Sequence, residues 1–72
     1  MNLVILRTDI GSKSRVQQMR PALDNHRSIH RWSIDLEDID NVLRIEAADS
    51  LNENEVIKLI DSYGFYGEEL ED

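Results

Sequence analysis

The sequence predicts an α+β fold in which one four-stranded antiparallel sheet is covered on a single face by two helices. Four segments have the period-two alternation or the β-branched content of strands, and two have the apolar spacing of amphipathic helices. These segments follow one another in the order β-α-β-β-α-β. This order is that of the split βαβ, or ferredoxin-like, sandwich.

The first strand and the first helix are predicted on either side of a short loop. Residues 2–8, "NLVILRT", are apolar on both faces of a strand. We expect a helix to begin after Gly11, because the hydroxyl of Ser12 can accept a hydrogen bond from a backbone N–H of the first turn. Pro21 lies inside this helix and lacks a backbone donor, so a kink or a loosened turn is expected there. The apolar face of the helix consists of Val16, Met19 and Leu23, with Ala22 beside them.

A hairpin is predicted in the middle of the chain. Residues 29–38 alternate with period two, and residues 41–47 form the next strand, with Leu43 and Ile45 facing inward. The polar turn "EDIDN" joins them, and so short a connection allows only an antiparallel pair. The inward residues expected on the first of these strands are Trp32, Ile34 and Leu36.

The last third of the chain predicts a second helix and a short end segment. Ser50 followed by Glu53 has the spacing of a capping box, and Gly64 has the place of a C-terminal helix cap. Residues 65–70 are expected to form a short fourth strand or a tail, and residues 67–72 an acidic tail. The apolar side of the helix is expected to consist of Leu51, Val56, Leu59 and Ile60.

Composition limits the classes of function. With 72 residues the chain is expected to be a single domain, 1–72, and 40% hydrophobic content is typical of a globular protein. The net charge of −7 argues against nucleic acid and anionic membranes as partners. No apolar run approaches the roughly 20 residues of a membrane helix, and nothing predicts a signal peptide, so a cytoplasmic location is expected. The chain has no cysteine, hence no disulfide and no thiolate ligand.

The residue pattern along the chain resembles that of the heavy-metal-associated (HMA) domain family. This family includes small copper chaperones and metal-binding modules of cation-transporting ATPases. In the short members that it resembles, the first strand runs into Thr-x-Ile-x-Cys-x-x-Cys-Val, followed by a helical Pro, a Trp-x-Val-Asp strand and a Gly-Phe pair. The resemblance covers nearly the whole chain and implies the ferredoxin-like fold. The matching residues are Thr8, Ile10, Val16, Pro21, Leu23, Trp32, Ile34, Asp35, Leu43, Ile45, Glu46, Gly64 and Phe65.

The chain departs from this pattern at the metal ligands. Ser12 and Arg15 occupy the two cysteine positions, or, in an alternative register, Asp9 and Ser12 do. The resemblance implies a site that holds a soft cation such as Cu(I) between two thiolates. A serine hydroxyl is a hard, protonated donor, and a guanidinium has no lone pair to offer. We therefore expect no metal ligand and no cofactor at this loop.

The loop "TDIGSKSRV" keeps one functional interpretation. Backbone N–H groups at a helix start favour an anion, and two neighbouring cations would add charge-assisted contacts to a small anion or an acidic protein partner. In the simpler alternative, Ser12 only caps the helix, Lys13 is solvated and Asp9 neutralises Arg15. The candidate binding residues are Asp9, Gly11, Ser12, Lys13, Ser14, Arg15 and Phe65.

Other candidate sites have weaker patterns. His26 and His30 are four positions apart but straddle a helix end, so we expect surface histidines rather than a metal pair. The acidic turn "DLEDIDN" lacks the glycine and the oxygen spacing of a calcium loop. No serine has an identifiable base and no carboxylates converge, so an enzyme is not expected.

The sequence therefore predicts a non-catalytic binding module that resembles a copper-chaperone domain without its metal ligands. It would act through protein contacts or an anion at the former metal loop. Two alternatives remain: a homodimerising assembly or regulatory domain that uses its sheet face, where Leu3 and Ile5 point outward, and a residual cation-binding or transport-related protein. A monomer or a weak homodimer is expected.

Overall fold

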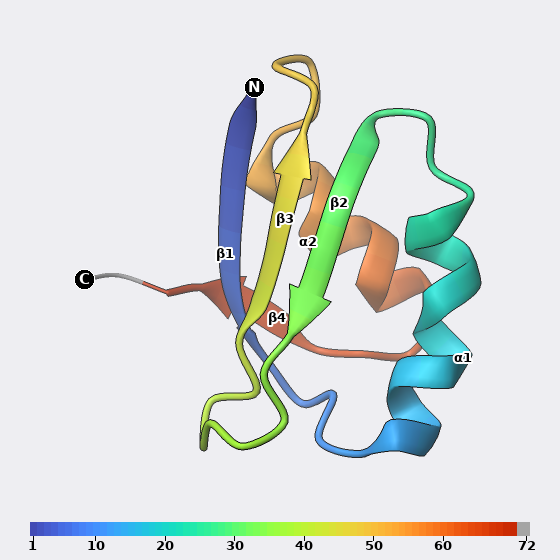
Figure 1. Cartoon of the computed structure of the whole chain (residues 1–72), viewed down its shortest axis with the longest axis vertical. Helices are drawn as coiled ribbons and strands as arrows, with labels where there is room; N and C mark the ends of the chain where they lie inside the picture. The colour runs from blue at the N-terminus through green and yellow to red at the C-terminus, as the bar shows by residue number, and fades with distance from the viewer. Residues whose placement is uncertain (71–72) are drawn as a thin grey trace.

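A computed structural model describes residues 1–70 of the chain. Its elements follow the predicted order β-α-β-β-α-β (Figure 1). They are β1 (Asn2–Thr8), α1 (Lys13–Asp24), β2 (Ile29–Ile34), β3 (Leu43–Ala47), α2 (Glu53–Ser62) and β4 (Gly67–Glu69). Within these residues no helix combines the length and apolar content needed to cross a membrane.

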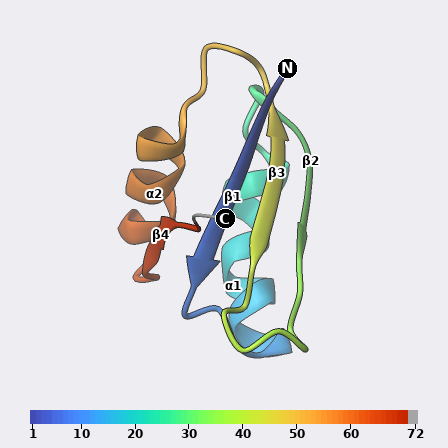
Figure 2. The ribbon, with the colours of Figure 1, turned by 90° about the vertical axis from the view of Figure 1, so that its left-hand side faces the viewer.

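The four strands form one sheet in the order β2-β3-β1-β4. Each neighbouring pair is antiparallel, which confirms the predicted hairpin between β2 and β3. Figure 2 shows the sheet from the side, with α2 on one face of it. Helix α1 contributes to the same core as α2, so both helices cover one face and the ferredoxin-like fold is confirmed.

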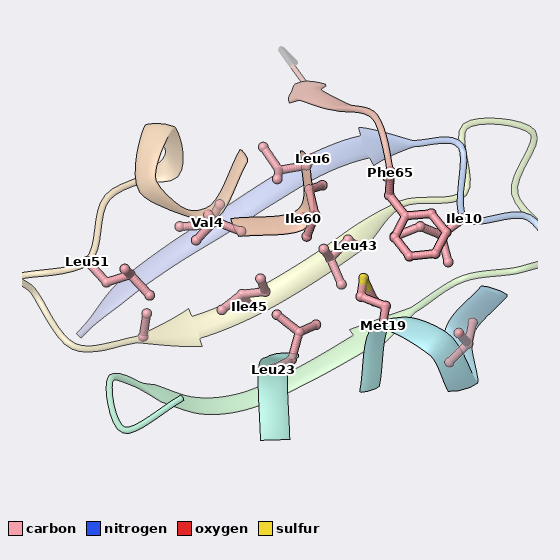
Figure 3. Packing of buried hydrophobic residues seen from close by; sticks show 13 residues of the cluster. Val4, Leu6, Ile10, Met19, Leu23, Leu43, Ile45, Leu51, Ile60 and Phe65 are labelled. Carbon is pink, nitrogen blue, oxygen red and sulfur yellow. The ribbon is translucent and has the colours of Figure 1, made fainter. Parts of the chain in front are cut away.

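The core lies between the helices and the inward face of β1 and β3 (Figure 3). Alternate residues of these strands are buried because successive side chains of a strand point to opposite faces. Trp32 and Ile34 of β2 point the same way but stay half-buried, since β2 is an edge strand. The largest fully buried side chains are Leu6, Ile10, Met19, Leu23, Leu43, Ile45, Val56 and Ile60.

Helix α1 starts as the sequence predicts. Ser12 is the N-cap, in an extended conformation, and its hydroxyl accepts a hydrogen bond from the backbone N–H of Arg15 at 3.2 Å. Pro21 lies within the helix, where it removes one backbone donor. The expected kink at Pro21 stays a prediction.

Helix α2 corrects one prediction and confirms another. The N-cap is Asn52, whose side chain accepts from the N–H of Glu55 at 3.0 Å, so the capping box predicted at Ser50 and Glu53 is wrong. The helix therefore begins two residues later, and Leu51 is buried just before the cap. At the other end Gly64 has φ +87°, the left-handed conformation that suits glycine after a helix.

The segment after α2 is a strand rather than only a tail. Residues Gly67–Glu69 pair with β1, with Thr8 opposite Gly67 and Leu6 opposite Glu69. The predicted acidic tail of residues 67–72 is therefore wrong for its first three residues, and its last two lie outside the described residues. A Cβ on Gly67 would stand 2.5 Å from Cδ1 of Ile60, so only glycine fits where β4 passes under α2 without a shift of the core.

Candidate functional site

The loop between β1 and α1 is held by the turn that joins β2 to β3. The backbone N–H of Thr8 donates to the carbonyl of Asp40 at 3.0 Å, and its hydroxyl donates to the carbonyl of Asn41 at 2.7 Å. The same hydroxyl accepts from the N–H of Ile10 at 3.1 Å. Ile10 is fully buried and anchors the middle of the loop in the core. The loop is thus held by the β2–β3 turn and by the core before α1 begins.

Asp9 ties the loop to the start of β4. Its Oδ1 accepts from the backbone N–H of Tyr66 at 2.8 Å, and its own N–H donates to the carbonyl of Tyr66 at 3.3 Å. Nη1 of Arg15 donates to the backbone carbonyl of Asp9 at 3.0 Å and lies 3.6 Å from Oδ2 of the same residue. The prediction that Asp9 neutralises Arg15 is confirmed.

The remaining loop residues are exposed. Gly11 approaches the side chain of Asn41, and a Cβ there would lie 3.2 Å from Nδ2. Lys13 and Ser14 make no hydrogen bond through their side chains, and Lys13 makes no ion pair, among residues 1–70. The structure brings six of the seven candidate residues together at this loop.

The seventh candidate, Phe65, has a different position. Only 5% of it is exposed, and its ring packs near Ile10 and Met19 at the end of the core beside the loop (Figure 3). The expectation that Phe65 forms part of a contact surface is therefore wrong. The exposed aromatic residue is Tyr66, 56% of which is accessible. The alternation of inward and outward residues after Gly64 was the available sequence signal for this exchange.

Tyr66 belongs to a polar cluster beside the loop. Its hydroxyl donates to Oε2 of Glu68 at 2.5 Å, while Arg7 binds Oε1 of Glu68 at 3.1 Å and Oδ1 of Asp40 at 3.2 Å. The hydrogen bond from Tyr66, and then that from Arg7, lower the pKa of Glu68 below its ordinary value. The same bond to Glu68 raises the pKa of Tyr66. This cluster joins β1, β4 and the β2–β3 turn.

The donor set at the loop does not fit a soft metal ion. The hydroxyl of Ser12 caps α1, and Arg15 carries a positive guanidinium that is held by Asp9. In the alternative register, Oδ1 of Asp9 is engaged by Tyr66. Elsewhere, Nδ1 of His26 accepts from the N–H of Ser28 at 3.1 Å. In the part of the chain that is described, no three His, Cys, Asp or Glu residues group as metal ligands.

A groove that the sequence did not indicate lies between α1 and β2. It has a volume of about 440 Å³, and one wall is the half-buried ring of Trp32. The indole N–H donates to Oδ1 of Asp24 at 2.8 Å, and the guanidinium carbon of Arg20 stands 5.2 Å from the ring centre. Nη1 of Arg20 also lies 3.9 Å from Oδ2 of Asp24. The groove depends on residues of two elements that meet only in the fold.

The comparisons with known proteins give a structural likeness alone. No model of a known protein family matches the chain, and no curated protein matches it. A solved structure described as "CsoZ metallochaperone" superposes with a TM-score of 0.76 over 93% of this chain and 96% of that one, at 19% sequence identity. At this identity the likeness shows the fold alone, and that fold is the ferredoxin-like sandwich described above.

Proposed function

We propose that this chain is a non-catalytic binding module, derived from a metal-carrying domain, which now acts through protein contacts at the β1–α1 loop. Its fold is that of a metallochaperone, and its residue pattern resembles the HMA family. The observation that carries the proposal is the Asp9–Arg15 contact, in which Asp9 holds a guanidinium at a position that one register of the resemblance assigns to a thiolate. A cytoplasmic location belongs to the same proposal.

The contacts of the loop favour a protein partner over an enclosed small anion. Arg15 is already held by the carbonyl and carboxylate of Asp9, and the Ser12 hydroxyl already accepts from the helix. Donors that already have partners within the loop are less available to a small anion. Among the exposed residues of the loop, the ammonium of Lys13 makes no ion pair within residues 1–70, and the ring of Tyr66 is exposed as well. An exposed cation and an exposed aromatic ring are residue types that suit an acidic patch on another protein.

The loop face, defined as residues 11–15 with Tyr66, can be tested by amide chemical shifts. An acidic peptide of Asp and Gly is the probe, because these residues have low strand propensity and report charge recognition alone. Shifts centred on the loop face are expected, and Lys13→Glu should remove them. Lys58→Glu is the matched control, since Lys58 belongs to α2 and its reversal changes the net charge equally.

Two results would contradict this proposal. Equal loss of the shifts in the Lys13 and Lys58 variants would mean that the peptide responds only to net charge. The same shifts produced by inorganic phosphate at similar affinity would indicate a small-anion site instead of a protein contact. Raising the salt concentration should weaken the genuine contact, because exposed charges are screened over about 8–10 Å.

A second candidate function is self-association through the open face of the sheet. Leu3 is 56% exposed on β1, and Ile5 beside it is half-buried, so both apolar side chains lie on the face away from the helices. Analytical ultracentrifugation tests this candidate. A dimer that Leu3→Glu dissociates would support it, whereas a monomer at high concentration would contradict it.

A further inference from the structure

We propose that the groove between α1 and β2 binds an extended acidic segment of a partner protein, which pairs with β2 as a fifth strand. This site is separate from the loop face, and the inference does not depend on the function proposed above. It rests on three properties of the groove: a free strand edge, a preformed aromatic wall and a local excess of positive charge.

The first property is the free edge of β2. This strand ends the sheet, and among residues 1–70 it pairs only with β3. The N–H of Asp35 donates to the carbonyl of Val42 at 2.9 Å, toward β3. Hydrogen-bonded and non-bonded pairs alternate in an antiparallel ladder, so the backbone groups of Trp32 and Ile34 point away from β3. They are available to an added strand.

The length of the edge limits the added strand. The β2–β3 register shifts between Ile29 and Arg31, which marks a bulge beside His30. Bulges interrupt regular pairing and twist an edge. Regular pairing is therefore expected over residues 31–34, which suits a short peptide segment better than a long strand.

The second property is the wall that the added strand would contact. Trp32 is fixed at both its edge and its face, by Asp24 through the indole N–H and by Arg20 over the ring. A side chain that is already held loses little conformational entropy on binding. The groove has about 440 Å³, within the usual range of ligand sites, and Val16 and Ile34 add apolar lining. Figure 1 shows α1 and β2 side by side at this edge of the molecule.

The third property is charge. The groove is lined by two arginines, Arg20 and Arg31, and by one carboxylate, Asp24. Arg20 lies on the helix side of the groove, 3.9 Å from Asp24, whereas Arg31 lies at the strand edge, is 81% exposed and has Glu46 3.7 Å away on β3. The lining of the groove therefore has a small excess of positive charge on a protein whose net charge is −7. It favours an acidic segment and opposes a second copy of β2, which would bring like charges together across the new ladder.

The geometry also predicts the pattern of the bound segment. Arg31 and Ser33 point to the open face of the sheet, whereas Trp32 and Ile34 point to the helix side. Side chains of an added strand alternate in the same way. Acidic residues would therefore face Arg31 and apolar residues would face Trp32, so a segment that alternates Asp or Glu with Val is the expected ligand.

The test uses the full chain and a blocked nine-residue peptide in which Glu alternates with Val. Amide hydrogen exchange should slow at Trp32 and Ile34 when the peptide is added, and Trp32 fluorescence should follow the same binding curve. Arg31→Glu should weaken binding about tenfold, as truncation or reversal of an interfacial charge does. Arg44→Glu is the matched control, because Arg44 is an exposed cation on β3, which is an inner strand of the sheet and not its edge.

Backbone methylation of the peptide separates strand addition from charge attraction. N-methyl groups on the residues whose N–H faces β2 should weaken binding about tenfold, as each removes a hydrogen bond and adds a clash. N-methyl groups on the alternate residues should have a much smaller effect. Since the protein itself is unchanged, a folding defect cannot explain the difference.

Three results would overturn the inference. The first is equal binding of the two methylated peptides. The second is unchanged amide exchange at Trp32 and Ile34 with bound peptide. The third is slower exchange at these amides that depends on protein concentration without peptide, which would make a second copy the occupant. Lys13→Glu should leave peptide binding at the groove unchanged, so failure here is distinguishable from failure of the loop proposal.

Discussion

The carboxylate of Asp9 accepts a hydrogen bond from the backbone N–H of Tyr66 at 2.8 Å, although 57 positions separate the two residues. This contact fixes the loop after β1 to the segment that precedes β4. The same residue holds the guanidinium of Arg15 through its carbonyl and Oδ2. Asp9 therefore organises the loop face and is expected to matter for both stability and binding.

Replacing Asp9 with Ala should lower the free energy of unfolding by about 1 kcal/mol. It removes one hydrogen bond to a charged acceptor, at a side chain that is 46% exposed, so the loss is smaller than for a buried group. For a chain of this size that loss corresponds to a melting temperature lower by roughly 4–8 °C. Urea unfolding measures it. Asp9→Asn should lose less stability, because its amide oxygen can still accept from the N–H of Tyr66. An equal loss of stability in the two variants would contradict this role of the Asp9 oxygen.

The cap of α2 gives a paired prediction. Asn52→Ala should cost about 1 kcal/mol, because it leaves the N–H of Glu55 without its side-chain acceptor. Ser50→Ala should change the free energy of unfolding by less than about 0.5 kcal/mol, as is usual at a surface position without such a contact. Thermal unfolding of the two variants compares them directly. A larger loss of stability in Ser50→Ala than in Asn52→Ala would contradict the cap seen in the structure and support a capping box at Ser50.

The close approach of β4 to α2 predicts coupling between Gly67 and Ile60. Gly67→Ala should destabilise the protein by about 1–3 kcal/mol, since the new Cβ would stand 2.5 Å from Cδ1 of Ile60. Ile60→Val removes that atom and alone costs about 1 kcal/mol. In a double-mutant cycle the combined variant should be more stable than the sum of the single losses. If the losses of the two single variants simply add, the new Cβ does not clash with Ile60 and other residues have shifted to make room for it.

The lowered pKa of Glu68 predicts a contribution to stability that depends on pH. A carboxyl group whose pKa is lower in the folded than in the unfolded state stabilises the protein above the unfolded pKa, near 4.5. That contribution is lost as the pH falls through the lower folded pKa. In Glu68→Gln the free energy of unfolding should therefore fall less steeply with decreasing pH below about pH 4.5.

Urea midpoints across this pH range test the prediction for Glu68. Glu69→Gln is the matched control, since Glu69 adjoins it and makes no side-chain hydrogen bond or ion pair among residues 1–70. An equal change in the two variants would mean that the effect belongs to the acidic segment and not to the contacts of Glu68 with Tyr66 and Arg7.

The fold could be predicted from sequence because its signals are local. The alternation around Leu43 and Ile45, the hydroxyl of Ser12 and the glycine at position 64 each act within a few residues. The error at Ser50 arose because Ser50 and Asn52 are both suitable caps, and the burial of Leu51 in the core selects between them.

The candidate site was predicted only in part, because tertiary contacts decide which groups face outward. Charge and spacing placed Asp9 beside Arg15, and the structure confirms that pair. The exchange of Phe65 for Tyr66 depends on how β4 is positioned by Asp9. The groove at Trp32 could not be predicted, since its partners Arg20 and Asp24 come from α1 and meet β2 only in the folded chain.

Competition for Cu(I) against a chelator of known affinity tests the central claim most directly. The unmodified chain should leave the metal with the chelator, because neither Ser12 nor Arg15 is a thiolate. The Ser12→Cys, Arg15→Cys double variant should take the metal from it, and circular dichroism verifies that this control folds. If the unmodified chain instead removed Cu(I) with the affinity of a two-thiolate site, the account of a loop that has exchanged a metal for protein contacts would be contradicted.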